Sequence, residues 1–319
     1  MITNLSKLED LEILVVGDIM MDEYVHGRVD RMSPEAPVPV VLIEEEHSVL
    51  GGAGNVAANL IALGAGVTVA GVVGDDTRGT FLINKLLKVG DGNASDCLVR
   101  DAGRVTTQKV RLVANGKQVA RIDREMTYPL ADYVADYMFK LIGKMNKFDA
   151  VIVSDYGKGV ITPYVFHAIM KQAELFNIFV AVDPSGTDYS KYKGANIITP
   201  NLSEAIAASG SESIIEAAEI IMEAAELPQL LITLGRGGMR LFEHRDVYHI
   251  DTAARGVFDV SGAGDTVIAA FTLAVSAGYS MAMAATISNI AAGIVVGKPG
   301  TATVSLEELE VKLEKEAVN

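Results

Sequence analysis

Ile13-Leu14-Val15-Val16 is a short β-branched run between Glu12 and Gly17, and it is the first of several such runs in the chain. Segments whose apolar residues recur at helical spacing separate these runs. This alternation is typical of an α/β fold, in which a mostly parallel central sheet is flanked by helices on both faces. The other runs are 67–73, 150–153, 179–182 and 230–234, and the helical segments include 56–63, 163–176 and 214–225.

Two stretches interrupt the alternation and read as pairs of extended strands. The second is folded at Asn115-Gly116, which is a strong hairpin signal. We expect the two pairs, at about residues 23–49 and 97–124, to follow the first and third core strands and to form a small β-sheet lid over the ligand crevice. Because the sequence contains no linker and no repeat, residues 1–319 are expected to form a single domain.

Composition limits the classes of function. Half of the 319 residues are hydrophobic, but no apolar run reaches the roughly 20 residues of a membrane helix, and the N-terminus lacks a signal-peptide pattern. We therefore expect a cytoplasmic protein without a membrane partner. The net charge of −14 argues against a nucleic-acid partner. The only cysteine, Cys97, excludes an intrachain disulfide and a multi-Cys zinc site.

Asp259-Val260-Ser261-Gly262-Ala263-Gly264-Asp265-Thr266 is the strongest chemical signal, and an apolar, Ala-rich helical stretch follows it. Glycines that lead into a helix start expose backbone N–H groups at the positive end of the helix dipole, where an anion is stabilised. We therefore interpret Gly262, Ala263 and Gly264 as an anion hole. Asp265 beside it would accept the proton of an attacking hydroxyl. The alternative is that Asp265 only caps the helix.

Gly52-Ala53-Gly54-Asn55-Val56-Ala57 fits the dinucleotide-binding pattern, and Asp75 follows at about the 20-residue distance of a ribose ligand. This fingerprint leaves a nicotinamide oxidoreductase open. Two observations argue against it. The preceding residues, Glu-Glu-Glu-His-Ser at 44–48, are a poor buried strand, and the hypothesis leaves the segment 259–265 unexplained.

Two further strand ends carry polar or glycine-rich turns. Asn201 and Glu204 lie one helical turn apart and would face hydrated Mg²⁺. Taken without the other motifs, they favour the alternative of a capping arrangement with Asn201 as N-cap and Glu204 at N3. Leu234-Gly235-Arg236-Gly237-Gly238 would let a nucleotide approach the backbone, or it is a plain hairpin turn.

In this order, the segments resemble the ribokinase-like (PfkB) carbohydrate kinases over nearly the whole chain. Within that family the chain is similar to the D-glycero-β-D-manno-heptose 7-phosphate kinases of ADP-heptose synthesis. Ser33-Pro34-Glu35-Ala36-Pro37-Val38-Pro39 is the most discriminating stretch, and 16–22, 154–159, 182–184 and 297–304 are also similar. Two features depart from the pattern. Gly54 stands where those kinases usually have Ala, and the sequence stops at Asn319 whereas many relatives continue into a nucleotidyltransferase domain, so no such domain is expected here.

The resemblance implies a ribokinase-like fold and an ATP-dependent kinase that phosphorylates the sugar at C1. It assigns Asp265 as the base and Gly262 to Gly264 as the anion hole. Mg²⁺ would be held by Glu204 through water, and a K⁺ site at Asp259 and Ser261 stays open. The implied sugar ligands are Asp22, Gly52 and Asn55, and the implied neighbours of Mg·ATP are Asn201, Glu204, Thr233, Gly235, Gly238, Asn289 and Ala292.

A heptose 7-phosphate needs a cationic pocket for its distal phosphate. Arg111, Arg121, Lys109 and Lys158 are candidates for it, and Asp123 and Asp155 are candidates for sugar hydroxyls; solvated surface positions and helix caps are the alternatives.

Other functions and partners stay open at this point. The functions are a pentose, fructose 1-phosphate or nucleoside kinase, the oxidoreductase, and a catalytically silent module. The expected partners are a second copy bound through the exposed lid strands and a separate nucleotidyltransferase of the same pathway.

Overall fold

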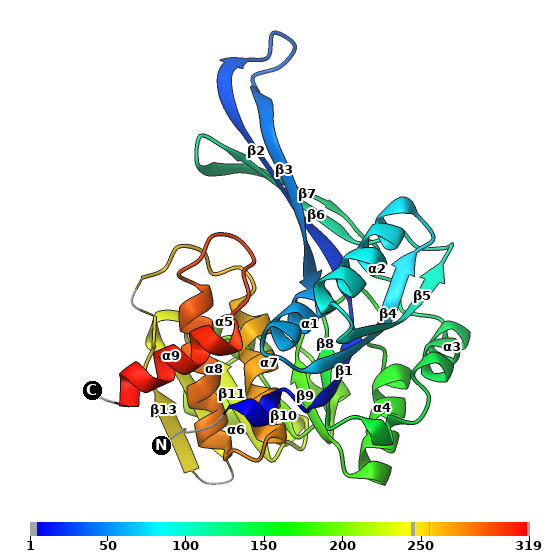
Figure 1. Ribbon diagram of the computed structural model, residues 1–319, viewed down its shortest axis with the longest axis vertical. Coiled ribbons are helices and arrows are strands. Elements are labelled where there is room, and N and C mark those ends of the chain that lie inside the picture. The colour runs from blue at the N-terminus through cyan, green and yellow to red at the C-terminus, as the bar shows by residue number, and fades with distance from the viewer. Residues whose placement is uncertain (1–4, 244–245, 255, 318–319) are drawn as a thin grey trace.

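The computed structural model describes residues 5–243, 246–254 and 256–317. Within these residues a nine-stranded central sheet has the order β13-β12-β11-β10-β9-β8-β1-β4-β5 (Figure 1). The strands from β5 to β11 are parallel, and β12 and β13 extend the sheet as an antiparallel hairpin, which confirms the predicted fold class. The strands are β1 (Glu12–Gly17), β4 (Gly66–Gly74), β5 (Ala94–Asp101), β8 (Ala150–Ser154), β9 (Phe179–Asp183), β10 (Ile197–Ile198), β11 (Gln229–Thr233), β12 (Met239–Glu243) and β13 (Asp246–Ile250).

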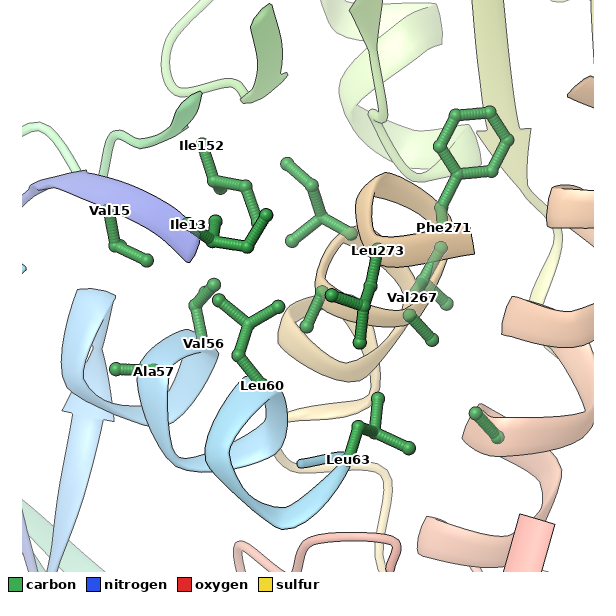
Figure 2. Packing of buried hydrophobic residues seen from close by; sticks show 14 of the residues in the cluster. Ile13, Val15, Val56, Ala57, Leu60, Leu63, Ile152, Val267, Phe271 and Leu273 are labelled. Carbon is green, nitrogen blue, oxygen red and sulfur yellow. The ribbon is translucent and has the colours of Figure 1, made fainter. Parts of the chain in front are cut away.

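Helices cover both faces of the central sheet because each core strand sends alternate side chains to opposite sides. In β1, Ile13 and Val15 join one buried cluster, which also contains side chains of α1, α2, α7, α8 and α9. Figure 2 shows the part of this cluster between β1, α1 and α7. Leu14 and Val16 join the other, with α3 to α6. Among the described residues, no helix combines the length and apolar character needed to cross a bilayer. The helices are α1 (Ala53–Ala62), α2 (Thr77–Gly90), α3 (Asp132–Ile142), α4 (Pro163–Phe176), α5 (Leu202–Ser209), α6 (Ile214–Ala224), α7 (Ala263–Ser276), α8 (Met281–Val295) and α9 (Leu306–Ala317).

The lid is a second sheet that starts directly after the carboxyl end of β1 and projects from the body (Figure 1). In the described chain its order is β3-β2-β6-β7, and the two hairpins are joined by parallel pairing of β2 with β6. Asn115 and Gly116 both have positive φ, 50° and 75°, as the predicted hairpin turn requires. The lid strands are β2 (Ile19–Met32), β3 (Pro39–Gly52), β6 (Gln108–Ala114) and β7 (Lys117–Arg124).

The expected boundary of the second lid segment, at residue 97, is wrong. Residues 94–101 form β5 at the edge of the central sheet, parallel to β4, and the second lid hairpin starts at Gln108. The reason is that this strand is buried on both faces. Cys97 and Val99 pack in one core cluster and Leu98 packs in the other, although charged residues flank all three.

The structure contradicts the dinucleotide-binding interpretation of Gly52 to Ala57. That fingerprint requires the glycines to follow a buried strand of the parallel sheet. Here they follow β3, an antiparallel lid strand whose residues are mostly exposed before Val49. The glycines serve instead to bring the start of α1 close to the end of β1.

Candidate active site

Asp265 is the third residue of α7, and a glycine turn sets the start of this helix. Gly262 is the N-cap with φ 77° and ψ 6°, a left-handed conformation that favours glycine. The first helical bond runs from the Thr266 N–H to the Gly262 carbonyl, 3.0 Å apart. The N–H groups of the preceding turn therefore have no carbonyl acceptor within the helix, and Gly264 among them is exposed. Of the three residues expected to form the anion hole, Ala263 already has an acceptor, because its N–H donates to the Val260 carbonyl at 3.2 Å.

The carboxylate of Asp265 is buried, and protein groups bond both of its oxygens. Asn55 Nδ2 donates to Oδ2 at 2.7 Å, and the Tyr156 hydroxyl donates to Oδ1 at 2.8 Å. Burial raises the pKa of Asp265 to about 6, and the charge of Asp22 adds to this, while the two hydrogen bonds oppose it. Such a carboxylate is ionised at neutral pH and is still basic enough to accept a proton.

Asn55 reaches Asp265 because the chain turns sharply between β3 and α1. Gly52 has φ 56°, and a Cβ on it would lie 2.3 Å from the carbonyl oxygen of Asp18. The same carbonyl accepts the Ala53 N–H at 3.1 Å, which fixes the first residue of α1. Asn55 is then the third residue of this helix, just as Asp265 is of α7.

Asp22 of β2 connects the lid to the site. Its buried carboxylate accepts a hydrogen bond from Arg111 Nη1 at 2.7 Å. The Arg111 guanidinium also lies over the ring of Tyr24, 5.2 Å from its centre. The Tyr24 hydroxyl in turn hydrogen-bonds Thr301 Oγ1 at 2.9 Å, so the lid contacts the segment that precedes α9.

The four candidate cations for a distal phosphate all have carboxylate partners. Arg111 pairs with Asp22, and Arg121 with Asp123 at 3.0 Å. Glu125, which sequence reasoning missed, contacts Lys158 at 2.9 Å and Lys109 at 3.6 Å. Each of the four cations is therefore neutralised by a carboxylate, and together they do not form a cluster of uncompensated positive charge for a phosphate. The remaining pair is Lys109 with Asp123, at 3.7 Å.

Asp155 has a set of partners that favours a structural role over the proposed sugar contact. Its Oδ2 accepts bonds from Lys191 Nζ and the Tyr192 hydroxyl, both at 2.7 Å. Its Oδ1 accepts the Gly157 N–H at 2.8 Å. These contacts anchor the loop after β8.

On the predicted nucleotide side, Asn201 and Glu204 form a capping box at the start of α5. Asn201 Oδ1 accepts the Glu204 N–H at 3.0 Å, and Glu204 Oε2 accepts the Asn201 N–H at 2.8 Å. Asn201 bridges to Thr233 at the end of β11, so both lie at the carboxyl edge of the sheet. The capping interaction that the sequence left open is therefore present. Asn201 is exposed and Glu204 is half-buried, so both could also contact a ligand.

The glycine-rich turn after β11 and the middle of α8 complete this side. A Cβ on Gly238, which has φ 78°, would lie 2.0 Å from the Ile250 carbonyl oxygen, whereas Gly235, with φ 56°, has open space around it. Asn289 Nδ2 donates to the Asp251 carbonyl at 2.6 Å and so holds the segment after β13. Ala292 is buried one helical turn after Asn289 on α8. The next residues, Gly293 and Ile294, line a surface hollow. Its other lining residues include Ala253, Val257 and Phe258.

Asp259 and Ser261 form a tight turn before α7. The Ser261 N–H donates to Asp259 Oδ1 at 2.8 Å, and the Asp259 N–H donates to the Val296 carbonyl at 3.2 Å. The turn fixes the approach to the helix start.

Sequence reasoning missed Asp18, Tyr156 and Asp183 as site residues. Each lies at or directly after the carboxyl end of a parallel strand, β1, β8 or β9. This position is the signal that could have found them, since ligands bind at that edge of open α/β sheets. Burial raises the pKa of Asp183 well above its ordinary value, and the charges of Asp265 and Glu204 add to this effect.

The profile of the pfkB carbohydrate kinases matches residues 10–309. The chain belongs to the pfkB family of carbohydrate kinases. This chain of the pfkB family is 47% identical over 311 residues to the bifunctional protein HldE of Trichlorobacter lovleyi, covering 95% of the chain and 63% of that relative. It is 45% identical over 322 residues to the HldE of Desulfatibacillum aliphaticivorans, covering 99% of the chain and 65% of the relative. The chain thus spans just under two thirds of the length of these relatives.

Solved structures of low sequence identity share the fold of this pfkB-family chain. Ribokinase of Arabidopsis thaliana, solved with ribose and ATP, has a TM-score of 0.76 at 20% identity, and the match covers 95% of this chain and 99% of that one. Phosphofructokinase-2 of Escherichia coli, solved with potassium, has a TM-score of 0.79 at 17% identity, with 96% and 99% covered. The predicted ribokinase-like fold is confirmed.

Proposed function

We propose that this chain transfers the γ-phosphoryl group of ATP to the C1 hydroxyl of D-glycero-β-D-manno-heptose 7-phosphate, which gives the 1,7-bisphosphate. The observation that carries the chemistry is the buried Asp265 carboxylate, held by Asn55 and Tyr156 beside the glycine-lined start of α7. The extent of identity to HldE proteins, together with the stretch 33–39, supports the heptose as substrate over other sugars.

In the proposed reaction Asp265 accepts the proton of the sugar hydroxyl while the oxygen attacks the γ-phosphorus and the bond to ADP breaks. The N–H groups of Gly262 and Gly264 donate to the oxygens of the transferred group, while the Ala263 N–H keeps its bond to the Val260 carbonyl. These residues fit a phosphoryl group because Gly264 is exposed and a Cβ added there meets no described atom within 4 Å. Lid closure through Asp22 would exclude water from the transfer.

The nucleotide is proposed to lie along the turn at Gly235 and Gly238 and the face of α8 that bears Asn289 and Ala292. Mg²⁺ carried by ATP supplies charge neutralisation on the phosphates. Glu204 at the start of α5 is proposed to hold this Mg²⁺ through water. The turn at Asp259 and Ser261 is the proposed K⁺ position, and replacing K⁺ by tetramethylammonium in the assay would test it.

The decisive test is ADP release from Mg·ATP with heptose 7-phosphate, ribose, fructose 1-phosphate and a nucleoside. Turnover with the heptose alone supports the proposal. Turnover with another sugar retains the kinase chemistry and rejects the heptose assignment. If no sugar supports turnover, the catalytically silent alternative is favoured.

We also propose a homodimer through the lid and a separate nucleotidyltransferase that acts in the same pathway. Large apolar side chains on the lid are between 44% and 61% exposed, which is costly in water. They are Met32, Val38, Leu42, Ile43, Val119 and Ile122. Sedimentation equilibrium should give twice the chain mass at micromolar concentration, and Leu42→Glu together with Ile122→Glu should give the monomer; a monomeric wild type would contradict the dimer.

A further inference from the structure

We infer that Tyr156 is a positioning residue for Asp265, whose hydroxyl fixes the direction of the base carboxylate through Oδ1. This inference rests on the proposed kinase reaction and extends it to a residue outside the glycine-rich segments. The bond is 2.8 Å long and joins residues 109 positions apart. Since Asn55 holds Oδ2 from the other side, the carboxylate is bonded at both oxygens by two separate segments of the chain.

Two donors leave the carboxylate able to act as a base. An ionised carboxylate has about four lone-pair directions, and Tyr156 and Asn55 together use two of them. The remaining directions accept the sugar hydroxyl. A carboxylate without the Tyr156 bond would rotate about its last torsion, which is broad and roughly two-fold for Asp, and would lose this alignment.

Asp18 holds the Tyr156 side of this arrangement. Its buried carboxylate accepts three backbone N–H groups of the loop after β8, from Tyr156 at 2.8 Å, Lys158 at 2.9 Å and Val160 at 3.2 Å. Its carbonyl oxygen accepts the Ala53 N–H, two residues before Asn55. One residue at the end of β1 therefore sets the place of both groups that contact Asp265.

The electrostatics of the site agree with a hydroxyl that always donates. Burial raises the pKa of Tyr156 well above its ordinary value, and the charge of Asp265 adds to this, so the phenol keeps its proton. Its bond opposes the rise in the Asp265 pKa that burial causes. The other charged groups that face this pair are Asp22 from the lid and Asp183 from β9, and Arg111 neutralises the first.

The test is the pH profile of kcat/KM for Tyr156→Phe, which keeps the ring and removes only the hydroxyl. We expect the acid limb to move to higher pH by about one pH unit, as the loss of one hydrogen bond to a charged group implies. The loss of kcat/KM should accordingly be about fivefold greater at pH 6 than at pH 8.5, and it should approach about tenfold at lower pH. An acid limb at the wild-type pH would overturn the inference.

Tyr164→Phe is the matched control. Tyr164 is 44% exposed and donates to Asp136 at 2.6 Å on the surface, far in sequence from Asp265. The Tyr164→Phe variant also loses a hydrogen bond from a tyrosine hydroxyl to an Asp carboxylate. Its pH profile of kcat/KM should match that of the wild type. Equal melting temperatures for the two variants would show that the effect of Tyr156→Phe is not a loss of fold.

A second measurement does not depend on turnover. Carbon-13 spectra of the Asp carboxyl groups, with the Asp265 signal assigned by its loss in Asp265→Asn, report the titration of this group directly. Its midpoint should be higher in Tyr156→Phe than in the wild type, and an unchanged midpoint overturns the inference. If the wild type titrates as described but phosphorylates no sugar, the proposed function fails while the positioning contact stands.

Discussion

Asn55 and Asp265 each occupy the third position of a helix, and the amide nitrogen of the first lies 2.7 Å from a carboxylate oxygen of the second. The starts of α1 and α7 therefore converge on one point. The positive ends of two helix dipoles face the place where negative charge develops during phosphoryl transfer. The contact predicts how several substitutions will act.

Asp265→Asn should reduce kcat by about 10²-fold to 10⁴-fold, the usual contribution of a general base. The amide keeps the shape of the side chain, and its one oxygen can accept a hydrogen bond from either Asn55 or Tyr156. Neither of these contacts belongs to the proposed nucleotide site, so ATP affinity should be nearly unchanged. Single-turnover kinetics and nucleotide binding by calorimetry measure the two effects. A variant that retains most of its activity would reject Asp265 as the base.

The stability of the protein should depend on pH through the same residue. The pKa of Asp265 rises from an ordinary value of 3.8 to about 6 in the folded protein. The folded state thus holds this proton more tightly, so the stabilisation is complete below pH 3.8 and is lost as the pH rises through about 6. The rise in the pKa of Asp265 from 3.8 to about 6 corresponds to a change of roughly 3 kcal/mol in the free energy of unfolding. Asp265→Asn should therefore gain stability relative to the wild type between pH 4 and pH 7 in urea unfolding, and a constant difference would contradict this.

Gly262→Ala should damage the site beyond its effect on the backbone. A Cβ there would lie 2.5 Å from Asn55 Nδ2 and 2.8 Å from Thr301 Cγ2. Gly278→Ala is the control, since Gly278 has φ 90° and open space around it. Both variants should lose about 1 kcal/mol of stability from the left-handed conformation. Only Gly262→Ala should lower kcat, by at least about tenfold, because it displaces the Asn55 contact. Equal kcat values in the two variants would be the contrary result.

Glu204→Gln separates the two roles of this residue. Glutamine can still accept the Asn201 N–H, so α5 stays capped, but the charge that would face Mg²⁺ is lost. We expect the Mg²⁺ concentration for half-maximal rate to rise about tenfold, in line with loss of an outer-sphere ligand. Ser213→Ala is the control, because it removes the cap of α6 at a cost of about 1 kcal/mol without affecting Mg²⁺. An unchanged Mg²⁺ requirement would leave Glu204 as a cap only.

Asp22→Asn should raise the KM for the sugar by at least about tenfold and leave the KM for ATP unchanged, since it removes the carboxylate that is proposed to accept hydrogen bonds from the sugar hydroxyls. Asp30→Asn, on the same strand, breaks an exposed pair with Arg28 and should have almost no effect. Initial rates with each substrate varied in turn measure the difference. Equal sugar KM values for both variants would remove Asp22 from the proposed sugar site.

The sequence predicted β1, β4, β8, β9 and β11 because these strands are largely buried and read as apolar runs. It failed at β5, where Asp96 and Arg100 flank three buried residues and the alternation looks like that of a half-exposed strand. The junction between Gly262 and α7 was predictable because a glycine before a helix indicates a backbone conformation that other residues avoid. The partner of Asp265 in the loop after β8 was not, since the Tyr156 contact depends on where Asp18 fixes that loop.

The cations near the lid show a second limit of sequence reasoning. A sequence shows that Lys109 and Lys158 carry charge, but it does not show that Glu125 lies between them. Register across β6 and β7 and the path of the chain after β7 decide this pairing. A charge pattern in the sequence therefore predicts which segments carry charged side chains, but it does not predict which ion pairs those side chains form.

The convergence of α1 and α7 also has a consequence for synthesis of the protein. Asn55 leaves the ribosome 210 residues before Asp265, and the apolar side chains Val56 and Leu60 leave with it. Until α7 arrives to cover them, this side of the nascent chain exposes apolar surface to other molecules in the cell (Figure 2). Chaperones that bind apolar segments would cover this surface during the interval between the two helices.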